Sequence, residues 1–161
     1  MTKITIVIPH YNGIDILRDC LQSLFKNTFT DFITLVIDNG SSDGSQEFVK
    51  QEFPQVKLIE NEINLGYAGG CNQGIQMSDS PYILLLNNDT VMPENFLSEM
   101  IKVIENDDTI AMVQPKILSI QNRNHFDYSG GAGGELDIFG YPFARGRIFD
   151  EVEQDQGQYN A

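Results

Sequence analysis

The sequence predicts an α/β protein in which a mainly parallel sheet is flanked by helices. Short apolar runs alternate with segments whose apolar residues recur at helical spacing, from residue 4 to about residue 113. The runs lack the period-two alternation of strands with one wet face, so we expect strands that are buried on both faces. Alternating strands and helices favour right-handed βαβ units and therefore parallel strands.

The N-terminal part of the chain supplies two such strands. Residues 4–8 form a β-branched run closed by a proline, which predicts a buried strand. Apolar residues at helical spacing then predict a helix over residues 14–27. A second buried strand is predicted over residues 32–37, and the polar loop 38–45 and a short helix follow it.

The middle of the chain continues the pattern, with one irregularity. A short strand is predicted over residues 56–59, but segment 61–74 is a poor helix, since each glycine costs about 1 kcal/mol relative to alanine. We expect a helix start or a loop there, with its backbone close to a ligand. The wholly apolar run 82–86 is expected to be the central strand. A helix over residues 93–106 and a fifth strand over residues 110–113 should follow.

Beyond residue 115 the sequence is rich in turn formers. Residues 130–134 contain four glycines, and segment 140–147 combines glycine, proline and aromatic residues. These residues disfavour long regular elements. We therefore expect a long functional loop or a mixed sheet edge.

Composition limits the classes of function. Lys and Arg number 10 against 23 Asp and Glu, and the net charge of -13 argues against nucleic acid as a partner. Cys20 and Cys71 lack CxxC spacing, so we expect inert thiols in a reduced, intracellular protein. No apolar stretch approaches the roughly 20 residues that span a bilayer, and the chain opens directly into a strand. These features favour a soluble, cytoplasmic protein.

Three other readings are weak. The turn after the first strand, residues 9–13, lacks GxGxxG, which disfavours a nicotinamide dinucleotide. Residues 87–91 imitate the DxDxT motif of aspartyl phosphatases, but Asn87 cannot attack phosphorus as a carboxylate does. His10 and His125 are scattered, and we expect neither to be a metal ligand or a base.

Four polar loops follow four successive predicted strands. They are Pro9-His10-Tyr11-Asn12, the segment from Asp38 to Ser45, the segment from Asn64 to Asn72, and Asn87-Asn88-Asp89. Ligands of open α/β sheets bind outside the carboxyl ends of the strands, where these loops should meet. In this order the loops resemble the inverting glycosyltransferases of family two, especially their rhamnosyltransferase-like branch, over residues 4 to about 159. The resemblance implies the GT-A fold of nucleotide-diphospho-sugar transferases, with a Rossmann-like sheet.

The resemblance also implies the residues of a nucleotide site. The positions that match are Pro9, Tyr11, Asn12, Asp38, Asn64, Gly66, Asn72, Asn87 and Asn88. The Tyr11 ring matches an aromatic residue that packs near the base. Asp38 matches the carboxylate that accepts a hydrogen bond from the imide of uracil or thymine.

Asp89 matches the carboxylate that binds a divalent metal, Mg²⁺ or Mn²⁺. Such hard ions take oxygen ligands and can neutralise the charge of a leaving diphosphate. Asn87 departs from the family's DxD motif and brings no charge to the metal. The LNND form resembles the rhamnosyltransferase-like branch, so we expect a dTDP- or UDP-sugar donor, with rhamnose among the candidate sugars.

The resemblance divides the chain into a nucleotide-sugar-binding core, residues 1–114, and the start of an acceptor-side region, residues 115–161. Inverting transfer needs a general base for the acceptor hydroxyl. Asp127, Glu135 and Asp137 match no family base, so we expect the base beyond Ala161 and an N-terminal portion that transfers sugar poorly by itself.

Arg145 and Arg147 form a tight basic pair. One of them is expected to contact a diphosphate or an acidic acceptor, because a guanidinium fork suits phosphate oxygens. The alternative is pairing with Asp150, Glu151 or Glu153.

The expected partners are a nucleotide-diphosphate sugar donor and a glycan or lipid-linked saccharide acceptor, as in polysaccharide biosynthesis. The resemblance is compatible with action at the inner face of the membrane, with peripheral membrane association of the full-length protein, and with a homodimer. Two other classes stay open: a non-catalytic nucleotide-sugar binding module, and a nucleotidyltransferase. The latter usually carries a glycine-rich, basic first loop, which residues 9–13 lack.

Overall fold

A computed structural model describes residues 2–127, 131–148 and 150–159, so the predicted glycine-rich break at 130–134 and the chain end at Ala161 lie partly outside it. The chain forms two compact units, Met1–Glu99 and Met100–Ala161. Each unit is described by itself. The predicted division at residue 114 stays a prediction.

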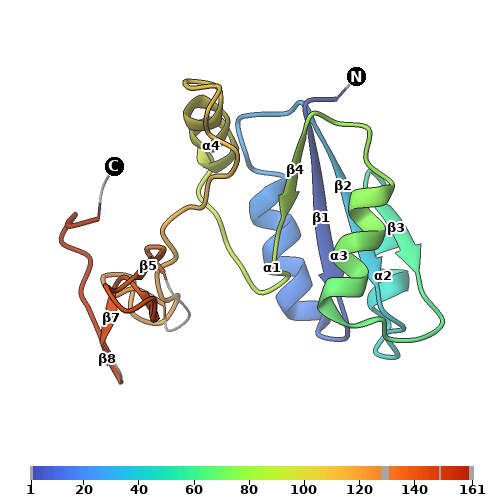
Figure 1. Cartoon of the computed structure of the whole chain (residues 1–161). Helices are drawn as coiled ribbons and strands as arrows, with labels where there is room; N and C mark the ends of the chain where they lie inside the picture. Colours follow the sequence, from blue (N-terminus) through green and yellow to red (C-terminus); the bar gives the residue numbers. More distant parts are fainter. Residues whose placement is uncertain (1, 128–130, 149, 160–161) are drawn as a thin grey trace. The chain divides into compact units, whose positions relative to one another are not determined.

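The first unit is built on a four-stranded parallel sheet. Its strands are β1 (Ile4–His10), β2 (Phe32–Asp38), β3 (Lys57–Glu60) and β4 (Tyr82–Leu85), in the order β3-β2-β1-β4 (Figure 1). All the pairs are parallel, so the four carboxyl ends lie at one edge of the sheet. This arrangement confirms the predicted α/β fold with a mainly parallel sheet.

Three helices belong to the first unit: α1 (Ile14–Leu24), α2 (Ser45–Glu52) and α3 (Gly66–Gln76). The fourth helix, α4 (Phe96–Ile104), includes the division between the two units after Glu99. The helices predicted over residues 14–27 and 93–106 are therefore present with shorter bounds. A stripe of α1 side chains is fully buried, as its spacing predicted: Leu17, Cys20, Leu21 and Leu24.

The glycine-rich segment 61–74 was predicted to be a helix start or a loop close to a ligand, and most of it forms the helix α3. A Cβ on Gly74 would lie 2.2 Å from Val7 Cγ1, and one on Gly70 would lie 3.2 Å from Pro9 Cβ. The helix thus packs directly on β1. These two glycines lack a side chain because the sheet, rather than a ligand, occupies the space.

The run 82–86 corrects an expectation. β4 is an edge strand of the sheet, and Ile83 and Leu85 are 39% and 43% exposed. β1 is the internal strand with all seven residues buried. An apolar run indicates that side chains avoid water but does not specify the order of strands. Among the described residues, β1 is the one strand that pairs with β4.

The second unit contains only short strands. β5 (Gly134–Leu136) pairs antiparallel with β6 (Pro142–Ala144), and β7 (Arg147–Ile148) with β8 (Glu151–Val152). The predicted mixed edge is therefore two separate antiparallel pairs. The strand predicted over residues 110–113 is wrong. Ile110 N–H donates to Asp107 O in a turn, and Met112 is 88% exposed, so the run has no sheet to join.

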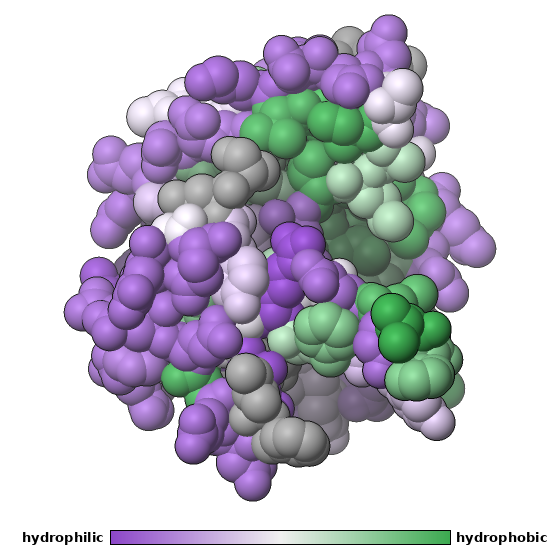
Figure 2. All heavy atoms as spheres, turned by 60° about the vertical axis from the view of Figure 1, so that its left-hand side comes forward, coloured by the Kyte–Doolittle hydropathy of each residue, from purple (hydrophilic) through white to green (hydrophobic). Residues whose placement is uncertain are grey.

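Apolar side chains are also exposed near the turn between β5 and β6. Leu136, Ile138 and Phe139 are 70%, 93% and 80% exposed. Figure 2 shows one face of the molecule, on which hydrophobic side chains gather in patches among hydrophilic ones. In the described part of the chain, no helix combines the length and the apolar character that crossing a membrane requires.

Candidate functional site

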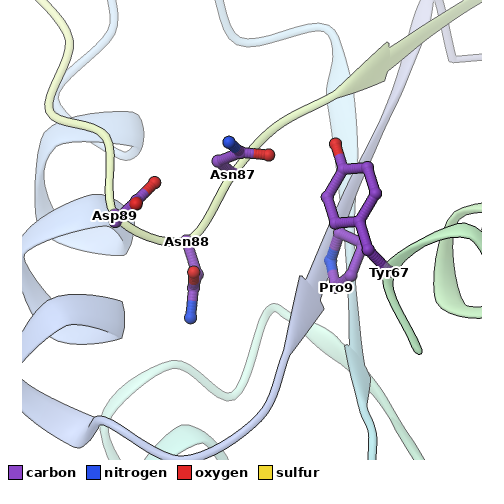
Figure 3. A pocket seen from close by; sticks show the side chains of 5 residues that line it. All are labelled: Pro9, Tyr67, Asn87, Asn88 and Asp89. Carbon is purple, nitrogen blue, oxygen red and sulfur yellow. The ribbon is translucent and has the colours of Figure 1, made fainter. Parts of the chain in front are cut away.

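A pocket of about 380 Å³ lies at the carboxyl edge of the sheet in the first unit. Its lining comes from three segments: the end of β1, the first turn of α3 and the loop after β4. The lining residues are Pro9, Tyr67, Asn87, Asn88 and Asp89 (Figure 3). The structure therefore brings together four of the predicted site residues.

The loop after β4 is fixed by its backbone. Asn87 O accepts a hydrogen bond from Thr90 Oγ1 at 2.8 Å and from Cys20 Sγ at 3.6 Å. Burial raises the pKa of Cys20 to about 11, so this thiol stays protonated at neutral pH. These two hydrogen bonds hold the backbone of the loop, and the side chains of Asn87 and Asp89 are exposed.

Asn88 points away from its two neighbours (Figure 3) and contacts His10. Asn88 Nδ2 lies 2.8 Å from His10 Nδ1. An amide nitrogen only donates, so Nδ1 accepts and the proton of the neutral ring is on Nε2. Burial lowers the pKa of His10, although Asp38 and Asp43 raise it, so the ring is neutral at neutral pH.

Asp38 does not line the pocket. Successive side chains alternate between the faces of a strand, so His10 and Asp38 lie on the face opposite α3. Asp38 is fully buried, and its Oδ1 accepts hydrogen bonds from Gly40 N–H, Ser41 N–H and Gln46 Nε2 at 3.1, 2.9 and 2.8 Å. The carboxylate thus holds the loop after β2, and its contact with a pyrimidine stays a prediction.

The next residue, Asn39, faces α3. Its Nδ2 donates to Gly66 O at 3.3 Å, and its Oδ1 accepts from Asn61 Nδ2 at 3.2 Å. A Cβ on Gly70 would lie 3.3 Å from Asn39 Nδ2. This buried amide therefore fixes the start of α3 beside Pro9. Asn39 was not among the predicted site residues, because in the sequence it is one polar residue of a polar loop.

Asn12 joins the loops after β1 and β2. Its φ is 54°, a left-handed conformation that asparagine tolerates better than most residues. Its N–H donates to Ser41 Oγ, and its Oδ1 accepts from Ser42 N–H, both at 2.9 Å. Tyr11 is 53% exposed and lies outside the pocket lining. Asn12 is thus a structural link at the predicted nucleotide loop.

Of the residues predicted around α3, none lines the pocket, but a neighbour does. Asn64 Oδ1 accepts from Gly66 N–H at 2.8 Å before the helix, and Asn72 is exposed on it. Tyr67, which lies within the predicted segment from Asn64 to Asn72 but was not a predicted site residue, is a lining residue. Burial raises the pKa of Tyr67, with Cys71 and Asp89 adding to the rise, so its hydroxyl stays a donor. An aromatic residue in the first turn of a segment expected near a ligand was the available signal.

A metal ion would find one carboxylate in this pocket. Within the described ranges, no group of three His, Cys, Asp or Glu side chains is arranged to hold a metal. Asp89 is the carboxylate that lines the pocket, beside the amides of Asn87 and Asn88. Mg²⁺ retains several waters and is often held by one or two carboxylates plus substrate phosphates. The donor set fits such an ion when a ligand supplies phosphate oxygens.

Arg145 and Arg147, the predicted basic pair, each form an ion pair in the second unit. Arg145 Nε donates to Glu135 Oε1 at 2.6 Å, and Arg147 lies 3.8 Å from Asp150. The pairing of Arg147 with Asp150 was the predicted alternative. The partner of Arg145 is Glu135 rather than an acid of segment 150–153.

Comparison with known proteins identifies the family. The family model described as Glycosyl transferase family 2 matches residues 5–152, and the chain therefore belongs to this family. The uncharacterized glycosyltransferase YibD of Escherichia coli (strain K12) is 31% identical over 113 residues, which cover 68% of this chain and 33% of that protein. The glucosyltransferase WfgD of Escherichia coli is 29% identical over 103 residues, 63% of this chain and 40% of that protein. The chain thus spans less than half the length of these relatives.

Solved structures show the same fold. A structure of S. aureus TarS 1-349 with UDP-GlcNAc aligns with a TM-score of 0.59 and 18% identity over 73% of this chain and 38% of that chain. A structure of the mannosyltransferase PcManGT from Pyrobaculum calidifontis with GDP-Man and Mn²⁺ aligns with a TM-score of 0.59 and 18% identity. The alignment covers 71% of this chain and 33% of that chain. The predicted GT-A fold is confirmed. The rhamnosyltransferase-like branch stays a prediction.

Proposed function

We propose that this chain binds the nucleotide-diphosphate sugar donor of an inverting glycosyl transfer. The observation that carries the proposal is the pocket at the carboxyl edge of the sheet, where a carboxylate, two amides and a phenol hydroxyl meet. TarS and PcManGT, which share the fold, have been solved with nucleotide sugars. In an open α/β sheet this edge is where ligands bind.

The pocket suits the diphosphate end of the donor. The Tyr67 hydroxyl and the Asn87 amide are exposed donors for phosphate oxygens, and Asp89 would hold Mg²⁺ or Mn²⁺ together with those oxygens. The bound ion would neutralise the charge that develops on the leaving diphosphate. The nucleoside would then lie along the joined loops after β1 and β2 and the start of α3, where Pro9, Tyr11, Asn12, Asp38, Asn64, Gly66 and Asn72 were predicted.

In the transfer, an acceptor hydroxyl attacks the anomeric carbon while the bond from that carbon to the diphosphate oxygen breaks, which inverts the configuration. A general base takes the hydroxyl proton. We assign that base to no residue of this chain, because Asp89 is the one carboxylate that lines the pocket and it is proposed to hold the metal. The acceptor is proposed to be a glycan or a lipid-linked saccharide, because the name of WfgD states a diphosphoundecaprenol-linked acceptor for that enzyme.

Donor identity follows from two different arguments. The LNND form favours a dTDP-sugar, with transfer of rhamnose. The name of WfgD states UDP-Glc, and TarS and PcManGT have been solved with UDP-GlcNAc and GDP-Man. We propose a uridine or thymidine diphosphate sugar and action in the cytoplasm, at the inner face of the membrane when the acceptor is lipid-linked.

One observation favours a second candidate, a non-catalytic nucleotide-sugar binding module. The pocket contains a single carboxylate, so it offers no separate base. Hydrolysis or transfer of a UDP-sugar by the full-length protein in the presence of Mn²⁺ would separate the two candidates, because a binding module would retain the donor intact.

Thermal unfolding with UDP, dTDP, GDP and CDP, each with and without Mn²⁺, tests the proposal. We expect UDP or dTDP with Mn²⁺ to raise Tm most, because a ligand that binds only the folded state stabilises it. If no nucleotide diphosphate raises Tm, the proposed donor site is wrong.

A further inference from the structure

His10 lies at the centre of the three loops that form the proposed donor site. It ends β1, it is in register with Asp38 at the end of β2, and it contacts Asn88 after β4. The ring is only 2% exposed. A polar side chain in such a position must satisfy its nitrogens within the protein, since a buried group without a hydrogen-bond partner destabilises the folded state.

One ring nitrogen has a defined partner. His10 Nδ1 accepts from Asn88 Nδ2 at 2.8 Å, which fixes the neutral tautomer with the proton on Nε2. The contact also fixes Asn88, so the flanking side chains of Asn87 and Asp89 face the pocket together (Figure 3).

The other ring nitrogen and one carboxylate oxygen form a complementary pair. Among the described residues, His10 Nε2 and Asp38 Oδ2 are both buried and hydrogen-bond to nothing. Nε2–H is a donor and Oδ2 is an acceptor, and their residues are adjacent on neighbouring strands. A direct contact, or one bridging water, would satisfy both groups.

We propose that His10 is a positioning residue, which accepts from Asn88 through Nδ1 and donates to Asp38 through Nε2 and thereby sets the Asn87–Asp89 loop for metal and diphosphate. The proposal rests on the proposed donor site and adds the residue that couples its two ends. Asp38 in turn holds the N–H groups of Gly40 and Ser41, so the coupling runs from the metal loop to the loop after β2.

Three substitutions separate the two contacts. His10→Phe removes both. His10→Asn places an amide oxygen near the position of Nδ1 and retains the acceptor for Asn88, while His10→Gln places an amide N–H near the position of Nε2 and retains the donor for Asp38. His125→Phe, at the other histidine of the chain, is the matched control.

The readout is the ratio of UDP affinity with Mn²⁺ to UDP affinity in EDTA, measured by calorimetry on the 161-residue chain. We expect His10→Phe to lower this ratio at least about fivefold, the equivalent of one hydrogen bond. His10→Asn, which retains the contact with Asn88, should restore the wild-type ratio. His10→Gln, which does not, should give the same ratio as His10→Phe. The control His125→Phe should give the wild-type ratio. A purely structural histidine would lower both affinities equally and leave the ratio unchanged, which would overturn the proposal.

A different result would contradict the proposed function itself: a wild-type chain that binds no UDP, dTDP or GDP, or that binds them equally with and without Mn²⁺. The proposal for His10 would then be wrong as well. NMR of the ¹⁵N-labelled histidines gives a test without nucleotide and without substitution. The expected state of His10 at neutral pH is a neutral ring protonated on Nε2. A ring protonated on Nδ1 would overturn the proposal even if His10→Phe fails to fold.

Discussion

The loops after β2 and β4 serve one proposed site but are built differently. Asp38, after β2, is fully buried and receives three N–H groups. Asp89, after β4, is exposed, and no described residue hydrogen-bonds or ion-pairs with its carboxylate. The first carboxylate is used within the protein, whereas the second is available to a ligand.

The difference indicates that two acids at the same sheet edge have different roles: Asp38 contributes to stability, and Asp89 is available for ligand binding. A buried carboxylate that accepts several hydrogen bonds from one loop fixes that loop before any ligand arrives. An exposed one costs little in the free protein and keeps its oxygens for a cation. Substitutions in the first loop should therefore change the free energy of unfolding, and substitutions in the second should change ligand affinity.

The largest expected effect on stability is that of Asp38→Ala. Two backbone N–H groups and the Gln46 amide would lose their acceptor, and we expect a loss of about 2–4 kcal/mol. Urea unfolding followed by circular dichroism measures it. Asp79→Ala, at an exposed acid just before β4, is the control and should stay within about 0.5 kcal/mol of wild type. Equal small losses for both variants would contradict the bracing role of Asp38.

A smaller effect is expected from Asp43→Ala. Asp43 is exposed, but its Oδ2 accepts from Gly13 N–H at 2.6 Å and its Oδ1 from Ser45 N–H at 3.1 Å, so it ties the starts of α1 and α2 together. We expect a loss of about 1 kcal/mol at neutral pH. Thermal unfolding would measure it, and an unchanged Tm would show that the tie is not needed.

The same carboxylate predicts a pH dependence. Slight burial raises the pKa of Asp43, but hydrogen bonds from the Ser45 hydroxyl, Gly13 N–H and Ser45 N–H lower it from 3.8 to about 2. Since the folded-state pKa is the lower one, the stabilisation is present above pH 3.8 and is lost as pH falls towards 2. The wild-type and Asp43→Ala curves of stability against pH should therefore converge in this window. A constant difference down to pH 2 would contradict the assignment.

Thr90→Val should have the smallest effect on stability. It removes the bond from Thr90 Oγ1 to Asn87 O, which is exposed, so we expect a loss of about 0.5 kcal/mol or less. Thr90→Val should weaken Mn²⁺-dependent UDP binding more clearly than it lowers stability, because it loosens the loop that presents Asp89. A stability loss as large as that of Asp43→Ala would remove the distinction between the two loops.

The sequence was sufficient to predict the parallel sheet and the strand ends at which the site lies, because apolar runs and the polar residues after them are local features. It did not predict the order of the strands, which placed β4 at an edge and β1 inside. It also left open whether segment 61–74 is a helix start or a loop, since helix propensity penalises glycine and says nothing of the sheet against Gly70 and Gly74.

The site residues divide in the same way. Pro9, Asn87, Asn88 and Asp89 were predicted and line the pocket. Tyr67 lines it through the geometry of α3. The contact between Asn88 and His10 joins residues 78 positions apart, and only the parallel register of β1 and β4 brings them together.

The most direct test is calorimetric titration of UDP, with Mn²⁺ and in EDTA, into the wild-type chain, Asp89→Asn and the control Asp79→Asn, with unfolding curves of all three. Asp89→Asn keeps the shape of the side chain and removes its charge, as Asp79→Asn does at an exposed acid just before β4. We predict that Asp89→Asn unfolds like wild type but binds UDP equally with and without Mn²⁺, while Asp79→Asn retains the full metal effect. A normal metal effect in a folded Asp89→Asn variant would contradict the account.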